Sequence, residues 1–240
     1  MNIIEIAAKK LLRQATIIHK MQIARNVYHI RLQSRSFKNV SYRPGYFVRV
    51  FCGKGEDIAR REKARCYSVW NFNRADRTID IAVVTHSGGP GANWAKLCQT
   101  GDMVYFDWFK SDLTIDHTGD HYLLLGDLTT LAHFYEINRN LPPDKNVDSL
   151  IYVENENDLF QDINGQTPLN FLQLSANPTD VIIEKLSAFL LQQGGKRIAY
   201  IGGDIRICQS VQRYFQQEFQ KAKGQIRIKP FWGPAMRALK

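Results

Sequence analysis

The sequence predicts a β plus α/β protein in two parts. An antiparallel six-stranded β-barrel is expected over residues 1–118, followed by a parallel-sheet α/β domain of the nucleotide-binding type over residues 119–240. Two observations predict this fold class. In the first half, apolar residues alternate with a period of two, as in half-buried strands. In the second half, short apolar runs alternate with stretches of helical spacing, as in βαβ units.

The first half contains six alternating segments separated by turn residues such as Pro44 and Gly45. Short strands with tight connections favour an antiparallel barrel, with a sandwich as the alternative. One helix is expected over residues 90–99, because Pro90 follows a glycine-rich segment and occupies the position that proline favours at a helix start. The predicted strands are 14–23, 27–33, 46–52, 65–70, 78–85 and 103–109.

The second half predicts a mainly parallel sheet. Its strands are expected at 121–125, 149–153, 169–174, 197–201 and 226–231, and its helices at 129–140, at 181–191 and after residue 204. Two of these strands end in Gly126-Asp127 and in Gly202-Gly203-Asp204. Open α/β sheets bind ligands at the carboxyl ends of their strands, so these glycines mark a candidate ligand edge, although no GxGxxG fingerprint is present.

The net charge of +9 lies entirely in the first half. Residues 1–118 contain nineteen Lys and Arg against ten Asp and Glu, whereas residues 119–240 are balanced. Such a basic half suits an anionic small molecule or an acidic protein partner. No nucleic-acid-binding motif is present, so nucleic acid is not an expected partner and a non-catalytic polyanion-binding module is a remote alternative.

The cysteine and histidine spacings exclude several other classes. The four cysteines form no CxxC pair and the six histidines show no metal-ligand spacing, so neither a disulfide framework nor a metal site is expected. No apolar run approaches the roughly 20 residues that span a bilayer, so no membrane association is expected. These features favour the cytoplasm, where thiols stay reduced.

The strongest candidate site is the segment Arg65-Cys66-Tyr67-Ser68. Side chains alternate along a strand, so Arg65 and Tyr67 share one face, where a cation for phosphate lies beside a planar ring. The glycine-rich segment 88–91 precedes a helix, and helix N-termini bind pyrophosphate. A barrel with this pattern, followed by a nucleotide-binding type of domain, indicates a flavin reductase with one cofactor for each domain.

Three motifs in order carry a family resemblance: 65–68 (RCYS), 85–94 (THSGGPGANW) and 125–131 (LGDLTTL). Together they resemble the siderophore-interacting protein family, which comprises flavin-dependent ferric-siderophore reductases of the ferredoxin-reductase superfamily. The resemblance extends from about residue 15 to residue 233.

The resemblance implies FAD as the cofactor. Arg65 would bind phosphate, Tyr67 would lie against the isoalloxazine and Ser68 near its N5, while Gly89 to Trp94 would hold the pyrophosphate and adenosine. The implied cofactor-binding residues are Arg65, Cys66, Tyr67, Ser68, Val83, His86, Gly89, Pro90, Gly91, Ala92, Asn93, Trp94, Thr129, Thr130 and Trp232.

The sequence departs from the family pattern at two places. The family strand usually reads Arg-x-Tyr-Thr-x-Arg, whereas this chain has Ser68, which keeps the hydroxyl, and Trp70, which removes the second cation. The family's Gly-Asp-Glu-Thr-Ala-Leu-Pro becomes Gly-Asp-Leu-Thr-Thr-Leu-Ala at 126–132. The resemblance therefore implies nicotinamide binding less strongly than it implies FAD binding.

The resulting hypothesis is an FAD-dependent reductase that releases Fe(II) from a ferric siderophore, with the chemistry carried by FAD and no protein catalytic residue or metal ligand assigned. The electron donor would be NADH, NADPH or a reduced ferredoxin-like protein. A basic rim for the anionic siderophore is expected from Lys54, Arg60, Arg61, Lys63, Lys229 and Arg237. The main alternative is a general flavin reductase or electron-transfer flavoprotein without siderophore specificity.

Overall fold

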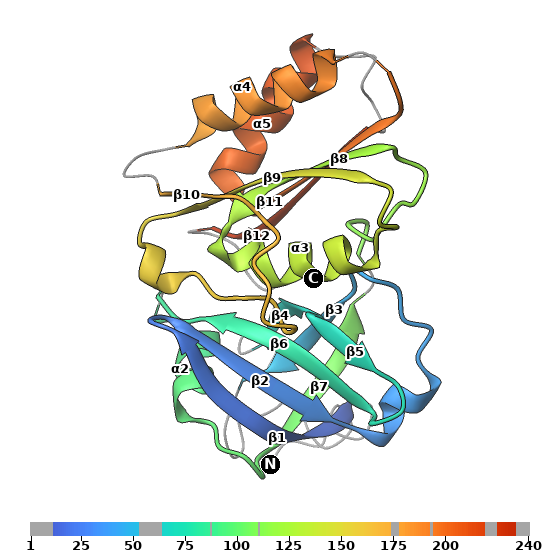
Figure 1. The fold of residues 1–240 in the computed structure, drawn as a ribbon. Helices are drawn as coiled ribbons and strands as arrows, with labels where there is room; N and C mark the ends of the chain where they lie inside the picture. Colours follow the sequence, from blue (N-terminus) through green and yellow to red (C-terminus); the bar gives the residue numbers. More distant parts are fainter. Residues whose placement is uncertain are drawn as a thin grey trace. The chain divides into compact units, whose positions relative to one another are not determined.

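The structure is a computed structural model that describes residues 12–52, 64–86, 88–109, 111–173, 178–192, 194–218 and 225–233. These residues form two compact units, divided between Ser111 and Asp112 (Figure 1). The predicted combination of an antiparallel sheet followed by a parallel α/β sheet is confirmed. The segment 112–118 lies in the second unit. Within the described parts of the chain, no helix has the length and apolar character needed to cross a membrane.

The first unit is a seven-stranded antiparallel sheet with the strand order β4-β3-β7-β1-β2-β6-β5. Each strand pairs antiparallel with its neighbour, and two irregularities in the pairing of β1 with β2 bend the longest strand. The strands are β1 (Arg13–Ala24), β2 (Val27–Gln33), β3 (Phe47–Phe51), β4 (Ala64–Ser68), β5 (Asn71–Asn73), β6 (Thr78–Val84) and β7 (Met103–Phe109).

The expected closed six-stranded barrel is corrected in two respects. A seventh strand, β5, is present, and the outer strands β4 and β5 do not pair with each other in the described residues. The connection from β4 to β5 explains why. The N–H of Val69 donates to the carbonyl of Tyr46, whereas the next N–H, of Trp70, donates to the carbonyl of Asp80 on β6. The chain thus changes its pairing partner within two residues, and the short strand β5 then forms the opposite edge of the sheet, next to β6.

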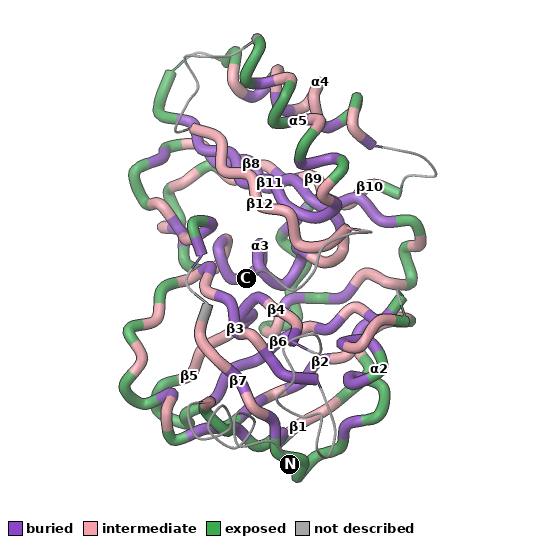
Figure 2. The backbone as a smooth tube through the Cα atoms, turned by 180° about the vertical axis from the view of Figure 1, so that it is seen from behind, coloured by how far each residue is buried: buried purple, intermediate pink, exposed green. Residues whose placement is uncertain are grey.

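In the described residues of the first unit, one helix and one 3-10 helix accompany the sheet. Helix α2 (Pro90–Leu97) buries Trp94 and Ala95 against a core formed by residues such as Ile30, Val50 and Phe106. In Figure 2 buried stretches of the tube are purple, and they recur along the strands of this unit. The 3-10 helix η1 (Arg35–Asn39) is capped by the side chain of Ser34. Burial of these apolar side chains is the main stabilising contribution of the unit.

The second unit is a five-stranded parallel sheet with the order β10-β9-β8-β11-β12. From β8 the chain extends to one side through β9 and β10, and then returns to the other side of β8 for β11 and β12. The reversal between β8 and β11 creates a topological switch point, where ligands bind in open α/β sheets. The strands are β8 (His121–Asp127), β9 (Asn146–Val153), β10 (Phe171–Gln173), β11 (Arg197–Asp204) and β12 (Ile226–Trp232).

Helices cover both faces of this sheet, which explains why the middle residues of its central strands β8 and β11 are apolar and buried. All eight residues of β11 are buried. Helix α3 (Leu131–Asn140), preceded by the 3-10 helix η4 (Leu128–Thr130), lies on one face, while α4 (Thr179–Leu191) and α5 (Ile205–Glu218) pack on the other (Figure 1). A further 3-10 helix, η5 (Glu156–Asp158), follows β9.

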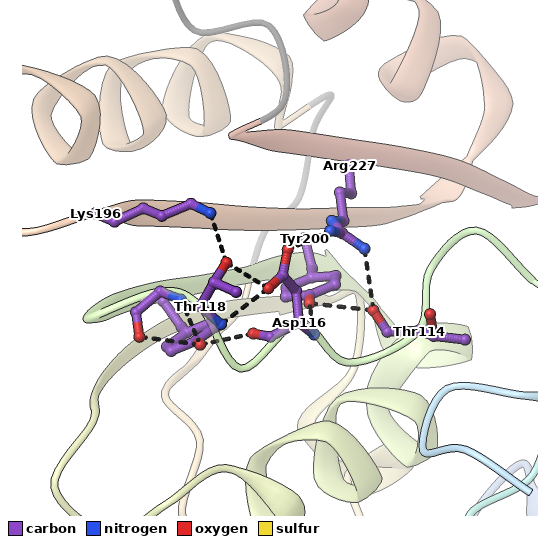
Figure 3. Close-up of polar contacts among 8 residues, drawn as sticks. Thr114, Asp116, Thr118, Lys196, Tyr200 and Arg227 are labelled. Carbon is purple, nitrogen blue, oxygen red and sulfur yellow. Dashed lines mark hydrogen bonds and ion pairs between the residues drawn. The ribbon is translucent and has the colours of Figure 1, made fainter.

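A polar cluster fixes the segment 112–118 to the amino end of the parallel sheet (Figure 3). The carboxylate of Asp116 pairs with the guanidinium of Arg227 on β12, and its backbone N–H donates to the Tyr200 hydroxyl over 2.8 Å. The Tyr122 hydroxyl donates to the Asp116 carbonyl over 2.6 Å, and the Lys196 ammonium donates to the Thr118 hydroxyl. Because three strands contribute partners, this segment is an integral part of the second unit.

Candidate functional site

Strand β4 and the start of helix α2 form the candidate site in the first unit. Arg65 and Tyr67 pair with Val50 and Val48 of β3, and directly opposite residues of an antiparallel pair project to the same face. Both side chains reach Gly91, since a Cβ built there would lie 3.2 Å from the Cγ of Arg65 and 3.4 Å from the Cζ of Tyr67. The two side chains therefore share one face, as the alternation along the strand predicts.

Gly91 brings the backbone of α2 into contact with this pair. A Cβ there would approach the Tyr67 hydroxyl oxygen to less than 3.0 Å, a separation that real Cβ atoms essentially never show. The helix starts at Pro90, and its cap residue Gly89 supplies no side-chain acceptor. The N–H groups of Gly91 and Ala92 have no acceptor within the helix, because the first turn precedes the i−4 ladder. This helix end presents N–H donors and a positive dipole beside Arg65.

Tyr67 is held as a neutral phenol. Its hydroxyl lies 3.9 Å from the Sγ of Cys52, and its ring lies 6.1 Å from the Trp94 ring at an interplanar angle of 30°. Burial raises the pKa of Tyr67 well above its ordinary value, and burial also raises the pKa of the Cys52 thiol to about 12. This face thus combines one cation with neutral groups.

Ser68 lies on the opposite face of β4, because it follows Tyr67 directly in the strand. Its side chain is 7% exposed, and its buried Oγ has no hydrogen-bond partner among the described residues. A buried hydroxyl without a partner costs about 1–3 kcal/mol. Such an atom in a native structure requires an explanation, and a bound ligand or an ordered water supplies one.

Trp70, at the position of the expected second arginine, is a core residue. It is 3% exposed, and its ring meets the His29 ring edge-on at 5.1 Å. The neighbouring carboxylate of Asp80 accepts hydrogen bonds from His29 Nε2 at 2.6 Å, Arg31 Nε at 2.7 Å and Asn71 Nδ2 at 3.0 Å. The burial of Asp80 opposes ionisation, yet these hydrogen bonds outweigh it and lower the pKa of the carboxyl.

The remaining expected cofactor residues of the first unit differ in exposure. Val83, Ala92 and Trp94 are buried in the described core, whereas Asn93 and His86 are exposed. Gly89, Pro90 and Cys66 are half-buried. The structure thus brings Arg65, Tyr67 and Gly91 together directly, and Trp94 supports Tyr67 from within the core.

In the second unit, the Asp127 carboxylate joins the carboxyl ends of the two central strands. Its Oδ1 accepts from the N–H of Thr129 at 2.8 Å and from the Thr129 hydroxyl at 2.5 Å. Its Oδ2 accepts from the N–H of Asp204 at 3.0 Å and from Trp232 Nε1 at 2.7 Å. Burial raises the pKa of Asp127, while the four donors oppose that rise. All four lone-pair positions are used, as an ionised carboxylate requires.

Thr130 and Lys229 lie close to this network. Thr130 is fully buried, and its hydroxyl donates to the Asp127 carbonyl over 2.7 Å. Lys229 is half-buried on β12. The other expected residues of the basic rim, Lys54, Arg60, Arg61, Lys63 and Arg237, lie outside the described residues.

Two family models match the chain. Residues 53–107 match the siderophore-interacting FAD-binding domain, and residues 119–235 match the siderophore-interacting protein model. The chain belongs to the siderophore-interacting protein family. Its cofactor is FAD, and it is a flavin oxidoreductase. No curated protein matches the sequence.

Solved structures share the fold of this siderophore-interacting protein at low sequence identity. The siderophore-interacting protein SipS from Aeromonas hydrophila is 18% identical, with a TM-score of 0.75, over 94% of this chain and 92% of that chain. A siderophore utilization protein from T. fusca is 17% identical, with a TM-score of 0.71, over 95% of each chain. A ferredoxin-NADP+ reductase mutant from Plasmodium falciparum is 16% identical, with a TM-score of 0.72, over 92% and 97%.

The geometry of the first unit fits FAD. The Ser68 hydroxyl, which has no partner in the described part of the chain, supplies a buried polar atom for the cofactor. Gly91 leaves the helix backbone without a side chain at a point where a Cβ would collide with Tyr67. The Cγ of Arg65 lies against Gly91 in the first turn of α2, and its Nη1 donates to the Ala64 carbonyl over 2.6 Å, so the cation lies on the strand next to this helix start. A cation and free N–H donors together bind phosphate, and an aromatic ring such as Tyr67 can stack on a flavin ring.

The sequence analysis missed two features of this siderophore-interacting protein. The first is the buried cluster around Asp80. The sequence signal for it is an acidic residue inside the apolar run 78–84, together with His29 and Arg31 two residues apart on another predicted strand. The second is the reach of the Asp127 carboxylate to Asp204 and Trp232. Those residues lie 77 and 105 positions away, and strand order alone gives no such contact.

Proposed function

We propose that this siderophore-interacting protein is an FAD-dependent reductase that delivers electrons to the Fe(III) of a siderophore and releases Fe(II). The observation that carries the proposal is the convergence of Arg65, Tyr67 and Gly91 on one side of β4. On the other side lies the buried Ser68 hydroxyl, for which the described residues offer no partner. The family match and the similarity to structures of siderophore-interacting proteins support the siderophore as the electron acceptor.

The protein's contribution is to bind and orient the cofactor, because bound FAD supplies the redox chemistry by accepting electrons in pairs and passing them on singly. Arg65 would pair with a phosphate, and the N–H groups of Gly91 and Ala92 would donate to the same anion. Tyr67, kept neutral by burial, would lie against the flavin ring. Ser68 would gain in the cofactor the partner that its hydroxyl lacks within the described residues.

Reduction of the metal accounts for iron release. Siderophore oxygens are hard ligands that suit Fe(III), and the softer Fe(II) is held less tightly. We assign binding of the anionic ferric siderophore to the basic rim that includes Lys229. The electrons would come from NADH, NADPH or a reduced electron-transfer protein. We place the reaction in the cytoplasm. The four cysteines are free thiols in the structure, and thiols stay reduced in that compartment.

The test is anaerobic stopped-flow on the purified chain. The protein should be yellow and should release FAD on denaturation. After photoreduction or reduction by dithionite, mixing with a ferric siderophore should reoxidise the flavin at least tenfold faster than mixing with ferric citrate. A colourless protein that takes up no FAD would exclude any flavin function.

One observation favours a second candidate, a general flavin reductase without siderophore specificity. Trp70 replaces the arginine of the family pattern, and it is buried against His29, so position 70 offers no cation to an anionic substrate. Equal reoxidation rates with ferric siderophore and ferric citrate would support this candidate over the specific reductase.

A further inference from the structure

Strand order divides the carboxyl edge of the second unit into two halves. Strand β8 lies at the centre of the sheet, with β9 and β10 on one side and β11 and β12 on the other. In sheets of this type a dinucleotide binds across the switch point, which here lies between β8 and β11. Further along the chain from the first strand, an acidic side chain binds a ribose 2′-hydroxyl, or an arginine accepts a 2′-phosphate. In this chain the next strand is β9, so the residue that ends it bears on this choice.

Glu154 directly follows β9, which ends at Val153. Val153 is buried and Glu154 is exposed, so the carboxylate lies at the edge of the sheet. The backbone carbonyl of Glu154 accepts a hydrogen bond from Gln173 Nε2 of the neighbouring strand β10 over 3.2 Å. The next residue, Asn155, caps η5, because its side-chain oxygen accepts from the N–H of Asn157 over 2.9 Å. These contacts hold the backbone on both sides of Glu154 and give its carboxylate a defined place.

The chain around Glu154 carries carboxylates and no cation. Residues 146–184 include β9, η5, β10 and the first half of α4, and they contain seven Asp and Glu but no Lys, Arg or His. Two of these acids, Glu156 and Asp158, lie in η5 directly after Glu154. A 2′-phosphate needs a cation, and a like charge placed next to it opposes binding. The β9 half of the edge therefore suits a ribose hydroxyl and not a phosphate.

The cation that the structure describes beside the switch point belongs to the other half of the sheet. Arg206 lies in the first turn of α5, directly after β11, and its Nε donates to the Asp204 carboxylate over 3.0 Å. Strand β11 lies on the opposite side of β8 from β9. A cation on that side suits the diphosphate, which NADH and NADPH share, so it does not distinguish the two dinucleotides.

A second observation points to a ligand at the same edge. Tyr152 lies two residues before Glu154 and directly opposite Asp127 of β8, so both side chains project to one face. It is 8% exposed, and its buried hydroxyl has no hydrogen-bond partner among the described residues. Burial raises the pKa of Tyr152, and the charges of Asp127 and Asp204 add to the rise, so the hydroxyl lies near the ends of β8 and β11. A buried hydroxyl of this kind requires an explanation, and a ligand at the edge supplies one.

We infer that Glu154 is a specificity-determining residue, whose carboxylate accepts a hydrogen bond from the ribose 2′-hydroxyl of NADH and repels the 2′-phosphate of NADPH. The inference rests on the proposed function and selects NADH among its electron donors. NADH would transfer a hydride to the bound flavin and leave as NAD+, and solvent would supply the one proton that completes the two-electron reduction. Both dinucleotides carry the same nicotinamide, so the discrimination belongs to binding and not to hydride transfer.

Direct binding tests the preference without any redox reaction. ADP-ribose and 2′-phospho-ADP-ribose, which differ only in the 2′-phosphate, are each titrated into the FAD-loaded chain in a calorimeter. ADP-ribose should bind at least about tenfold more tightly. A smaller ratio, or tighter binding of the phosphorylated compound, would overturn the inference. Absence of binding of both compounds up to about 5 mM would also overturn it, because the edge would then hold no dinucleotide.

A pair of variants tests the role assigned to Glu154. Glu154→Arg supplies the cation that a 2′-phosphate needs, so the variant should bind 2′-phospho-ADP-ribose at least about tenfold more tightly than the natural chain does. Glu184→Arg is the control, because it makes the same charge change at an exposed position of α4. Its neighbour Lys185 pairs with Asp148 near the start of β9 over 2.8 Å, so position 184 lies toward the other end of that strand.

The control should leave the ratio of the two affinities unchanged. An unchanged ratio in a folded Glu154→Arg variant, checked by circular dichroism, would refute the role of Glu154. An equal shift of the ratio in Glu184→Arg would refute it as well, because net charge alone would then account for the preference. If Glu154→Arg does not fold, the two titrations of the natural chain decide.

Flavin reduction provides a kinetic test. In anaerobic stopped-flow the KM for NADPH should exceed that for NADH at least about tenfold, while the limiting rates agree within about threefold. Equal KM values with unequal limiting rates would overturn the inference. So would a flavin that a reduced ferredoxin reduces and that neither dinucleotide reduces. Reoxidation of the dithionite-reduced chain by ferric siderophore tests the proposed function without any dinucleotide, so the two ideas fail separately.

Discussion

Replacement of Gly91 by alanine is the sharpest test of the site on β4. The substitution adds one methyl group to the first turn of α2, where it would meet the Tyr67 hydroxyl at less than 3.0 Å and Arg65 Cγ at 3.2 Å. The backbone of Gly91 does not have a positive φ. Any effect therefore arises from side-chain contact and not from backbone strain.

Two opposing contributions set the magnitude. Alanine is favoured over glycine within a helix by about 0.5–1 kcal/mol. Overpacking by one methyl group costs about 1–3 kcal/mol. The FAD-free variant should therefore lose at most about 2.5 kcal/mol of unfolding free energy. Because relief of the clash requires Tyr67 to shift, FAD affinity should fall at least tenfold, which corresponds to about 1.4 kcal/mol.

The assay is a double-mutant cycle on FAD affinity, measured by the quenching of flavin fluorescence upon binding. Tyr67→Phe deletes the oxygen that clashes, and the nearest atoms are then Arg65 Cγ at 3.2 Å and the ring carbon Cζ at 3.4 Å. The double variant should regain most of the affinity, with a coupling energy of about 1 kcal/mol or more. Gly101→Ala is the control, since Gly101 has a φ of 97° with no atom within 4 Å. It should lower stability without changing FAD affinity.

Two results would refute this reasoning. One is a Gly91→Ala variant that binds FAD as tightly as the natural chain. The other is a double variant whose loss equals the sum of the two single losses, because the methyl group and the hydroxyl would then act independently.

Three further predictions concern other groups. Ser68→Ala should leave the FAD-free chain equally stable or more stable, because it removes a buried hydroxyl that has no partner among the described residues. The same variant should bind FAD about threefold to tenfold more weakly through the loss of one hydrogen bond, whereas Ser68→Thr should retain the affinity. Asp80→Asn should lower the free energy of unfolding at pH 7 by about 3 kcal/mol. Since the folded pKa of Asp80 is lowered, its contribution is present above the unfolded pKa of about 3.9 and is lost as pH falls through the folded pKa, so urea unfolding of the variant should depend less on pH between 5 and 2. Asp116→Asn should lower stability by about 1–2 kcal/mol through the pair with Arg227, and equilibrium dialysis should show unchanged FAD affinity.

The sheets were predictable because their signals are local. Period-two alternation identified the six longer strands of the first unit, and continuous apolar runs identified the buried strands around β11. Helix α2 was predictable from Pro90, which fixes the start of a helix. Strand β5 was not, because Asn71–Asn73 is three residues long and asparagine is a poor strand former. It exists because β6 offers it a partner strand.

The site was predictable only in part. Strand alternation placed Arg65 and Tyr67 on one face, and the glycine-rich segment placed a helix start near them. The contact of Gly91 with Tyr67 depends on how α2 packs, and packing is not encoded in any short stretch of sequence. The same limit applies to Trp70. The sequence shows that tryptophan replaces the expected arginine. The contact of the Trp70 ring with the His29 ring depends on how distant segments of the chain pack.

The attachment of residues 112–118 has a practical consequence for dissecting the chain into fragments. A fragment that begins at residue 119, where the second family model begins, would lack Leu113 and Ile115, which are buried in the intact chain. His133 would lose the Leu113 carbonyl that its Nε2 meets at 3.0 Å, and Arg227 would lose the Asp116 carboxylate. A fragment that starts at Asp112 keeps these partners. Inclusion of the seven residues 112–118 therefore decides whether the fragment exposes part of its core or retains these native contacts.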